Sequence, residues 1–183
     1  MKKRAALAVL AGATAIICLK SWANSTLDAG PPLAGLRPGG QGTLRFWGLD
    51  IYQARLWVSP GFQADRYAAL PLALTLAYQR DFSAKSIAER SLTEMQRIGE
   101  FSTPQATQWR QDLQAALPDI KAGDQLTGLY QPGGASVFQI KGRTVGEVKD
   151  PAFGPLFFGI WLSARTSEPR LRDALLAMPG AAQ

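Results

Sequence analysis

The chain has 183 residues and a net charge of +6, and its length suits one domain with a sizeable core. It has no histidine and a single cysteine, Cys18. Zinc and copper sites normally need imidazole or thiolate, and Ser-His or Cys-His catalysis needs its histidine base, so the composition excludes these metal sites and mechanisms. We expect no cofactor.

The N-terminal segment is typical of a bacterial secretory signal peptide. Basic residues 2–4 precede an apolar run over residues 5–19, and the small residues Ser21 and Ala23 suit cleavage after Ala23. The run is shorter than the roughly 20 residues that a bilayer span needs. We therefore predict that residues 1–23 are a signal peptide and that the protein is periplasmic. An uncleaved inner-membrane anchor is the alternative.

Cleavage would change the charge of the chain. Residues 1–23 hold four of the 20 basic residues, none of the 14 acidic residues, and Cys18. The remaining chain has 16 basic and 14 acidic residues, a net charge of +2, and no thiol. Binding to a phosphate backbone calls for a concentrated basic face, so we expect no nucleic-acid partner.

Glycine, proline and alanine dominate residues 24–39, which predicts a flexible linker before a domain over residues 40–178, with a tail at 179–183. The domain opens with two extended segments, about Gly42–Gly48 and Asp50–Val58. Their aromatic and branched residues offer more apolar surface than one hairpin can hide, so the rest of the chain is expected to cover them.

A third strand is predicted over Pro71–Gln79, where residues alternate between two faces. Leucines and Tyr78 point one way, while Ala73, Thr75 and Ala77 point the other way. Because this second face is small and uncharged, we expect another segment to pack closely against it.

Two helices are predicted next. Ser83 suits the N-cap of a helix over Ser83–Phe101, whose charged residues fall mostly off the apolar stripe. Thr103, followed by proline, predicts the cap and start of the second helix. Glu89, Glu94 and Glu100 form no convincing acid/base pair, because nothing in their spacing indicates shared burial.

Strand patterns return over Asp124–Tyr130, Ser136–Ile140 and Thr144–Val148, separated by tight turns that predict a three-stranded meander. Asp150–Ser163 is apolar around most of a helix, and a short last helix is expected over Glu168–Leu176. The order of strands and helices predicts an α+β fold, with an antiparallel sheet covered by helices.

Four stretches of the chain resemble the chalcone isomerase-like domain family, particularly its bacterial secreted branch. In order, they are GQGTLRFWGLDIYQARLWV, LTLAYQRDFSAKSIAERS, AGDQLTGLYQPGG and FFGIWLSARTSEPRLRDALL. The resemblance implies an open-faced β-sandwich with a layer of helices over the sheet. It also implies a ligand cleft between the layers, as in the plant isomerases and their fatty-acid-binding relatives.

The same resemblance implies where catalytic groups would lie. The isomerases hold a developing phenolate with an arginine on the early strands, assisted by threonine, tyrosine and asparagine. When the chains are aligned on Ile51-Tyr52, the arginine position falls on Leu44, one residue before Arg45. A slip of one residue turns a strand side chain to the opposite face unless a bulge re-aims it. The tyrosine region holds Ser83–Lys85 and the asparagine position is about Arg90, so we expect no catalytic residue.

Arg45, Tyr52 and Tyr78 are the candidate ligand-binding residues. The planar fork of an arginine suits a carboxylate or a phenolate. Tyrosine hydroxyls on strands can line a cleft, although such tyrosines are more often core residues and such arginines more often face solvent.

Three hypotheses follow from the sequence. The first is a non-catalytic periplasmic protein that binds a small apolar or amphipathic ligand such as a fatty acid. The alternative is an isomerase or lyase acting on a phenolic or enone substrate. The third is a scaffold that binds another envelope protein through the surface around Trp109 or the last helix. A cleft beside Tyr52 would favour the first hypothesis, and a filled core would favour the third.

Overall fold

The computed structural model describes residues 32–178. The predicted signal peptide, most of the predicted linker and the tail at 179–183 lie outside these residues. The six strands, in chain order, are β1 (Arg37–Phe46), β2 (Leu49–Val58), β3 (Leu72–Tyr78), β4 (Gln125–Tyr130), β5 (Ser136–Ile140) and β6 (Arg143–Val148). Each strand pairs antiparallel with the next, so the sheet order is the chain order.

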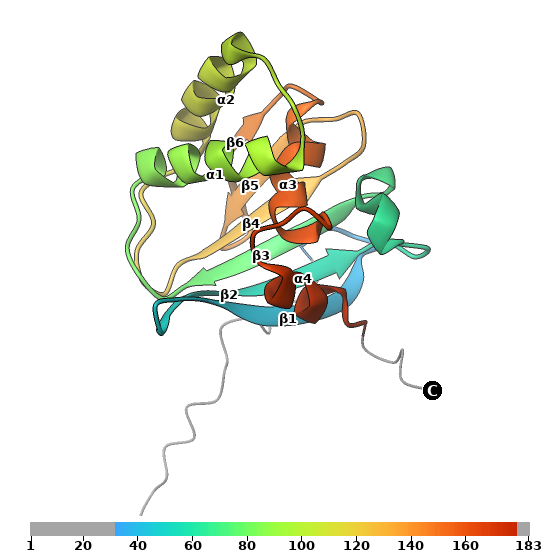
Figure 1. The fold of residues 1–183 in the computed structure, drawn as a ribbon. Helices are drawn as coiled ribbons and strands as arrows, with labels where there is room; N and C mark the ends of the chain where they lie inside the picture. Colours follow the sequence, from blue (N-terminus) through green and yellow to red (C-terminus); the bar gives the residue numbers. More distant parts are fainter. Residues whose placement is uncertain (1–31, 179–183) are drawn as a thin grey trace, which may run out of the picture.

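Helices cover one face of this sheet (Figure 1). Between β2 and β3 lies the short 3-10 helix η1 (Ala64–Ala69). Helices α1 (Ala84–Ile98) and α2 (Thr103–Ala116) separate β3 from β4, while α3 (Phe153–Leu162) and α4 (Pro169–Leu176) follow β6. The predicted α+β fold is confirmed. Within residues 32–178, no helix is both long enough and apolar enough to cross a bilayer.

Strand β1 begins at Arg37, three residues before the predicted start of the domain. Proline is tolerated in an edge strand, and β1 lies at the edge of the sheet. A Cβ atom added to Gly40 would overlap the carbonyl oxygen of Ala174 in α4 and lie 2.7 Å from that of Leu175. Glycine at this position therefore allows α4 to pack directly on the backbone of β1, and these residues belong to the fold.

Two hairpins of the sheet have the same kind of turn. Trp47 and Gly48 join β1 to β2 with φ angles of 51° and 77°, and Lys141 and Gly142 join β5 to β6 with 51° and 74°. Two successive positive φ angles match the type I′ turn, which follows the natural twist of a hairpin. In both hairpins a non-glycine residue, Trp47 or Lys141, therefore adopts a left-handed conformation that is unfavourable for L-residues.

Side-chain caps fix where α1 and α2 begin. As predicted, Ser83 is the N-cap of α1, and its hydroxyl accepts a hydrogen bond from the backbone N–H of Ser86 at 3.1 Å. The N-cap of α2 is Ser102 and not the predicted Thr103. Ser102 and Gln105 form a reciprocal capping box, which satisfies backbone N–H groups that would otherwise be unpaired.

Asp81 and Asp150 hold segments that are distant in the chain. Asp81 accepts from the backbone N–H of Ala122 at 2.9 Å and from the ammonium group of Lys121 at 3.0 Å, and these two bonds lower its carboxyl pKa. Asp150 accepts from the indole N–H of Trp109 at 2.8 Å, which ties α2 to the start of α3.

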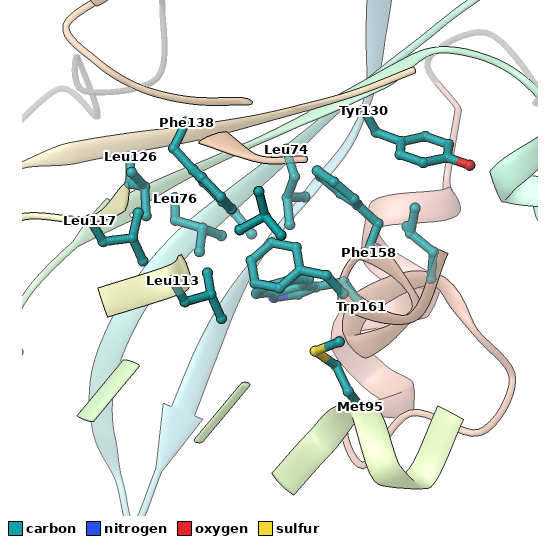
Figure 2. Close-up of a cluster of buried hydrophobic side chains, with 14 of the residues drawn as sticks. Leu74, Leu76, Met95, Leu113, Leu117, Leu126, Tyr130, Phe138, Phe158 and Trp161 are labelled. Atoms are coloured by element: carbon teal, nitrogen blue, oxygen red, sulfur yellow. The ribbon is translucent and has the colours of Figure 1, made fainter. Parts of the chain in front are cut away.

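Figure 2 shows the main core, where side chains from the sheet and from α1, α2 and α3 meet. Trp109 lies in this core and is 1% exposed, so its own side chain is not available for docking. Binding of another envelope protein by the surrounding surface or by the last helix stays a prediction. A smaller cluster on the other face of the sheet contains Ala73, Trp57 and Leu129, covered by Leu36. The predicted close packing against the small face of β3 is thus confirmed.

Candidate ligand-binding cavity

A cavity of about 370 Å³ lies between the sheet and the helices. Its wall contains residues of β1, β2, β3, β4, α1 and α3, and most of them are apolar. The segment leading into α4 adds Ser167 and Glu168. The core is therefore hollow beside Tyr52, which is the arrangement that favours a ligand-binding protein over a scaffold with a filled core.

Three facing residues of β1, β2 and β3 form part of the cavity wall. Leu44 is opposite Tyr52, and Tyr52 is opposite Tyr78. The register between β1 and β2 then shifts, because Arg45 pairs with Asp50 and Ile51 is passed over. This irregularity allows both Ile51 and Tyr52 to line the cavity.

Arg45 lies outside the cavity wall. Its side chain is 70% exposed, and its Nε donates to Asp50 Oδ1 at 2.6 Å. The bulge that was considered as a means of re-aiming Arg45 is present, yet it directs this side chain towards Asp50 on the surface. Leu44, at the position where the resemblance places an arginine, lines the cavity instead.

Tyr52 and Tyr78 meet at the cavity with their rings 5.6 Å apart at 65°. The Tyr52 hydroxyl accepts a hydrogen bond from the indole N–H of Trp161 at 2.9 Å. Burial raises the pKa of Tyr52, although the bond from Trp161 acts in the opposite direction, and burial likewise raises the pKa of Tyr78. Both phenols are therefore protonated at neutral pH. Whether either tyrosine contacts a ligand stays a prediction.

Helix α1 contributes a polar stripe that the sequence analysis missed. Arg90, Ser91 and Glu94 all line the cavity, and Glu94 is only 5% exposed. One Glu94 oxygen lies 2.8 Å from Arg90 and the other lies 3.5 Å from Arg97. The expectation that the charged residues of this helix avoid its buried face is wrong for Glu94, because two arginines compensate the buried carboxylate.

The spacing of α1 held a signal for this stripe. Ile87, Ser91, Glu94 and Ile98 fall at i, i+4, i+7 and i+11, which places them on one face of a helix. Ile98 is buried and Ile87 lines the cavity. Because Glu94 lies between Ile87 and Ile98 on this face, the spacing indicates that a carboxylate of α1 is buried beside other polar groups.

The tip of the β1–β2 hairpin remains uncovered, contrary to the expectation that the domain hides this surface. Phe46, Trp47 and Leu49 are 58%, 89% and 47% exposed. Phe46 also belongs to the cavity wall, so this apolar tip lies beside the cavity.

The chemistry of the described residues suits binding of an apolar body with a polar end. Hydroxyl donors and one guanidinium interrupt a largely apolar wall. Residues 32–178 contain no group of three or more His, Cys, Asp or Glu side chains that could hold a metal ion.

An antiparallel sheet covered on one face by helices, with an apolar cavity between the layers, defines a class of open-faced α+β domains. Residues 36–177 match the chalcone isomerase-like family, and the chain belongs to it. The family match begins at the residue before β1 and ends just beyond α4.

Two relatives illustrate how far the similarity extends. An uncharacterized protein of Haemophilus influenzae is 22% identical over 151 residues, which cover 82% of this chain and 73% of that protein. The crystal structure of a fatty-acid-binding protein of Arabidopsis thaliana superposes with a TM-score of 0.60 at 13% identity. That alignment covers 79% of this chain and 88% of the other, and it shows a shared fold.

Proposed function

We propose that this chain is a non-catalytic binding protein for a small apolar or amphipathic molecule, of which a fatty acid is one example. The observation that carries the proposal is the 370 Å³ cavity, with its apolar wall and the neighbouring side chains of Tyr52 and Tyr78. Small-molecule pockets typically measure about 300–1,000 Å³ and combine an apolar wall with a few polar groups. The shared fold with a fatty-acid-binding protein supports the same class of ligand.

The position of Arg45 supports binding without catalysis. Stabilising a developing phenolate needs a preorganised cationic or hydrogen-bonding group aimed at the reacting oxygen. Arg45 faces Asp50 at the surface, and Leu44 supplies only methyl groups to the cavity. An isomerase of the type that the family resemblance implies would lack its main electrostatic group.

The proposed location is the periplasm, after cleavage behind Ala23. It is supported by the basic and apolar pattern of residues 1–23. N-terminal sequencing of the protein recovered from a periplasmic extract should begin at Asn24. A chain that stays in the inner membrane and starts at Met1 would support the anchored alternative.

Native mass spectrometry of periplasmic protein tests the binding function, together with titration of a fluorescent fatty acid. We expect added mass on the native protein and saturable fluorescence. Leu44→Trp should abolish the added mass and the fluorescence signal, because the larger side chain fills the cavity. Val145→Trp is the control and should leave both signals unchanged, because Val145 is an exposed residue of β6 outside the cavity wall. Bare protein that binds neither a fluorescent fatty acid nor a neutral ester of a fatty acid would refute the proposal.

Incubation with chalcones tests the non-catalytic part of the proposal. We expect conversion at the uncatalysed rate, both for the native chain and for Arg45→Ala. Turnover by the native chain above the uncatalysed rate would overturn this part, and its loss in Arg45→Ala would place Arg45 in contact with the substrate.

A further inference from the structure

Three hydroxyl groups of the cavity have unused donor capacity. The Tyr78 side chain is 5% exposed, yet within residues 32–178 its hydroxyl has no hydrogen-bond partner. Ser91 is 7% exposed, and its hydroxyl is likewise unpartnered in the described part of the chain. Tyr52 accepts from Trp161, while its own proton has no acceptor among those residues. Each of these hydroxyls belongs to a residue of the cavity wall, so it can donate to an acceptor on a molecule that occupies the cavity.

The cavity wall offers no unpaired positive charge among the described residues, and it contains two acidic side chains. Arg90 is the only cationic residue in that wall among residues 32–178, and it is bound to Glu94 at 2.8 Å. Glu168 adds a second carboxylate to the wall. A ligand carboxylate would therefore find no free cation and would approach two acidic side chains. If a ligand carboxylate drew Arg90 away from Glu94, the buried Glu94 carboxylate would lose part of its counter-charge, and leaving a buried charge unpaired is costly.

We propose that the polar end of the ligand is an uncharged acceptor, such as an ester, ketone or amide carbonyl, and that the cavity disfavours a free carboxylate. This inference rests on the proposed binding function. The hydroxyls of Tyr52, Tyr78 and Ser91 can donate to a neutral oxygen without any counter-charge. Burial holds the pKa of both tyrosines above the ordinary value, so these donors persist through the physiological pH range.

The negative charge of Glu94 makes the cavity bind a neutral carbonyl more tightly than a carboxylate. Its side chain is 7% exposed, and Glu94 is the only charged residue that is buried among residues 32–178. Charges interact more strongly in an apolar surrounding than in water, so a ligand carboxylate nearby would be repelled. The same carboxylate tolerates a neutral carbonyl, because that oxygen carries only a partial charge.

Methyl decanoate and decanoate, which share an acyl chain and differ in charge, provide the test. Displacement of a bound fluorescent neutral probe at pH 8 gives both affinities for the delipidated chain. We expect methyl decanoate to bind at least about tenfold more tightly than decanoate. Tyr78→Phe should weaken methyl decanoate about fivefold, because it removes one donor.

Glu94→Gln tests the source of the discrimination. It frees Arg90 and removes a negative charge, so decanoate should gain about tenfold in affinity while methyl decanoate changes little. Glu89→Gln is the matched control on the same helix, because Glu89 is exposed and pairs with Lys85 at 3.9 Å. If Glu94→Gln does not fold, Glu168→Gln provides the same comparison at the second acidic residue of the wall.

The possible outcomes separate this inference from the proposed function. The neutral-ligand inference is overturned if decanoate binds as tightly as methyl decanoate. It is also overturned if Glu89→Gln raises the affinity for decanoate as much as Glu94→Gln does. Either result leaves the binding function standing. Failure of both compounds and of the fluorescent fatty acid to bind overturns the proposed function itself.

Discussion

Replacing Tyr52 by phenylalanine should destabilise the ligand-free protein, whereas the same replacement of Tyr78 should not. Tyr52→Phe removes the acceptor of the Trp161 indole N–H, which is bonded at 2.9 Å on a side chain that is 7% exposed. An unpaired donor in such a place costs about 1–2 kcal/mol. Tyr78→Phe removes a hydroxyl that has no partner within residues 32–178, so it should leave stability unchanged or raise it by up to about 1 kcal/mol.

Urea unfolding followed by circular dichroism measures both free energies of unfolding. For a domain of this size, the loss in Tyr52→Phe corresponds to a decrease in melting temperature of about 2–8 °C. The protein must first be delipidated by unfolding and refolding, because a bound ligand stabilises the native state by mass action and would hide the difference. Equal slopes of the unfolding curves would show that the comparison is valid.

A double-mutant cycle with Trp161→Phe isolates the hydrogen bond. The cost of Tyr52→Phe should largely vanish when Trp161 is already replaced, whereas the effect of Tyr78→Phe should remain the same. If Tyr78→Phe destabilises the protein as much as Tyr52→Phe, the Tyr78 hydroxyl has a partner in the ligand-free state. The inference that it awaits a ligand acceptor would then be refuted.

Three further predictions concern the fold, and urea unfolding measures each of them. Gly40→Ala should lower the free energy of unfolding by about 3 kcal/mol, because the added Cβ meets the backbone of α4, whereas Gly48→Ala, in open space with φ of 77°, should cost only about 1 kcal/mol. Trp47→Asn and Lys141→Asn should each stabilise by about 1 kcal/mol, because asparagine suits the type I′ turn; a gain in Lys141→Asn alone would indicate that Trp47 makes a stabilising contact. The lowered pKa of Asp81 contributes stability that is present above pH 4 and is lost as the pH falls through the folded pKa, so Asp81→Asn should show a smaller stability loss between pH 5 and pH 2; an unchanged loss would contradict this assignment.

The strands and helices could be predicted because their periodicity follows directly from which face is buried. In β3, leucines alternate with small residues, and the structure buries both faces as that pattern indicates. Ser83 gave the start of α1 because a serine before an amphipathic segment has a specific capping role. These features depend on residues that are close together in the sequence, so the sequence alone can predict them.

The start of β1 and the charges of the cavity could not be predicted in the same way. Glycine and proline normally indicate a linker, but Arg37 and Pro38 pair with β2, and a Cβ atom on Gly39 would lie 3.2 Å from the carbonyl oxygen of Leu56. The helical spacing predicts that Glu94 lies off the apolar stripe of α1, and charged side chains are rarely buried unless they are paired. Its burial depends on Arg90, Arg97 and the hollow between the layers, and those are properties of the assembled fold.

The register of the first hairpin links the fold to the proposed function. With Leu44 opposite Tyr52 and Arg45 opposite Asp50, the strands supply no guanidinium to the cavity. A cation enters the wall from α1 instead, and Arg90 arrives together with its counter-ion, Glu94. A paired guanidinium has less attraction left for a developing phenolate or a free carboxylate. The cavity thus has a paired helix arginine where the family resemblance implies a strand arginine. This difference argues both for binding in place of catalysis and for a ligand with an uncharged polar end.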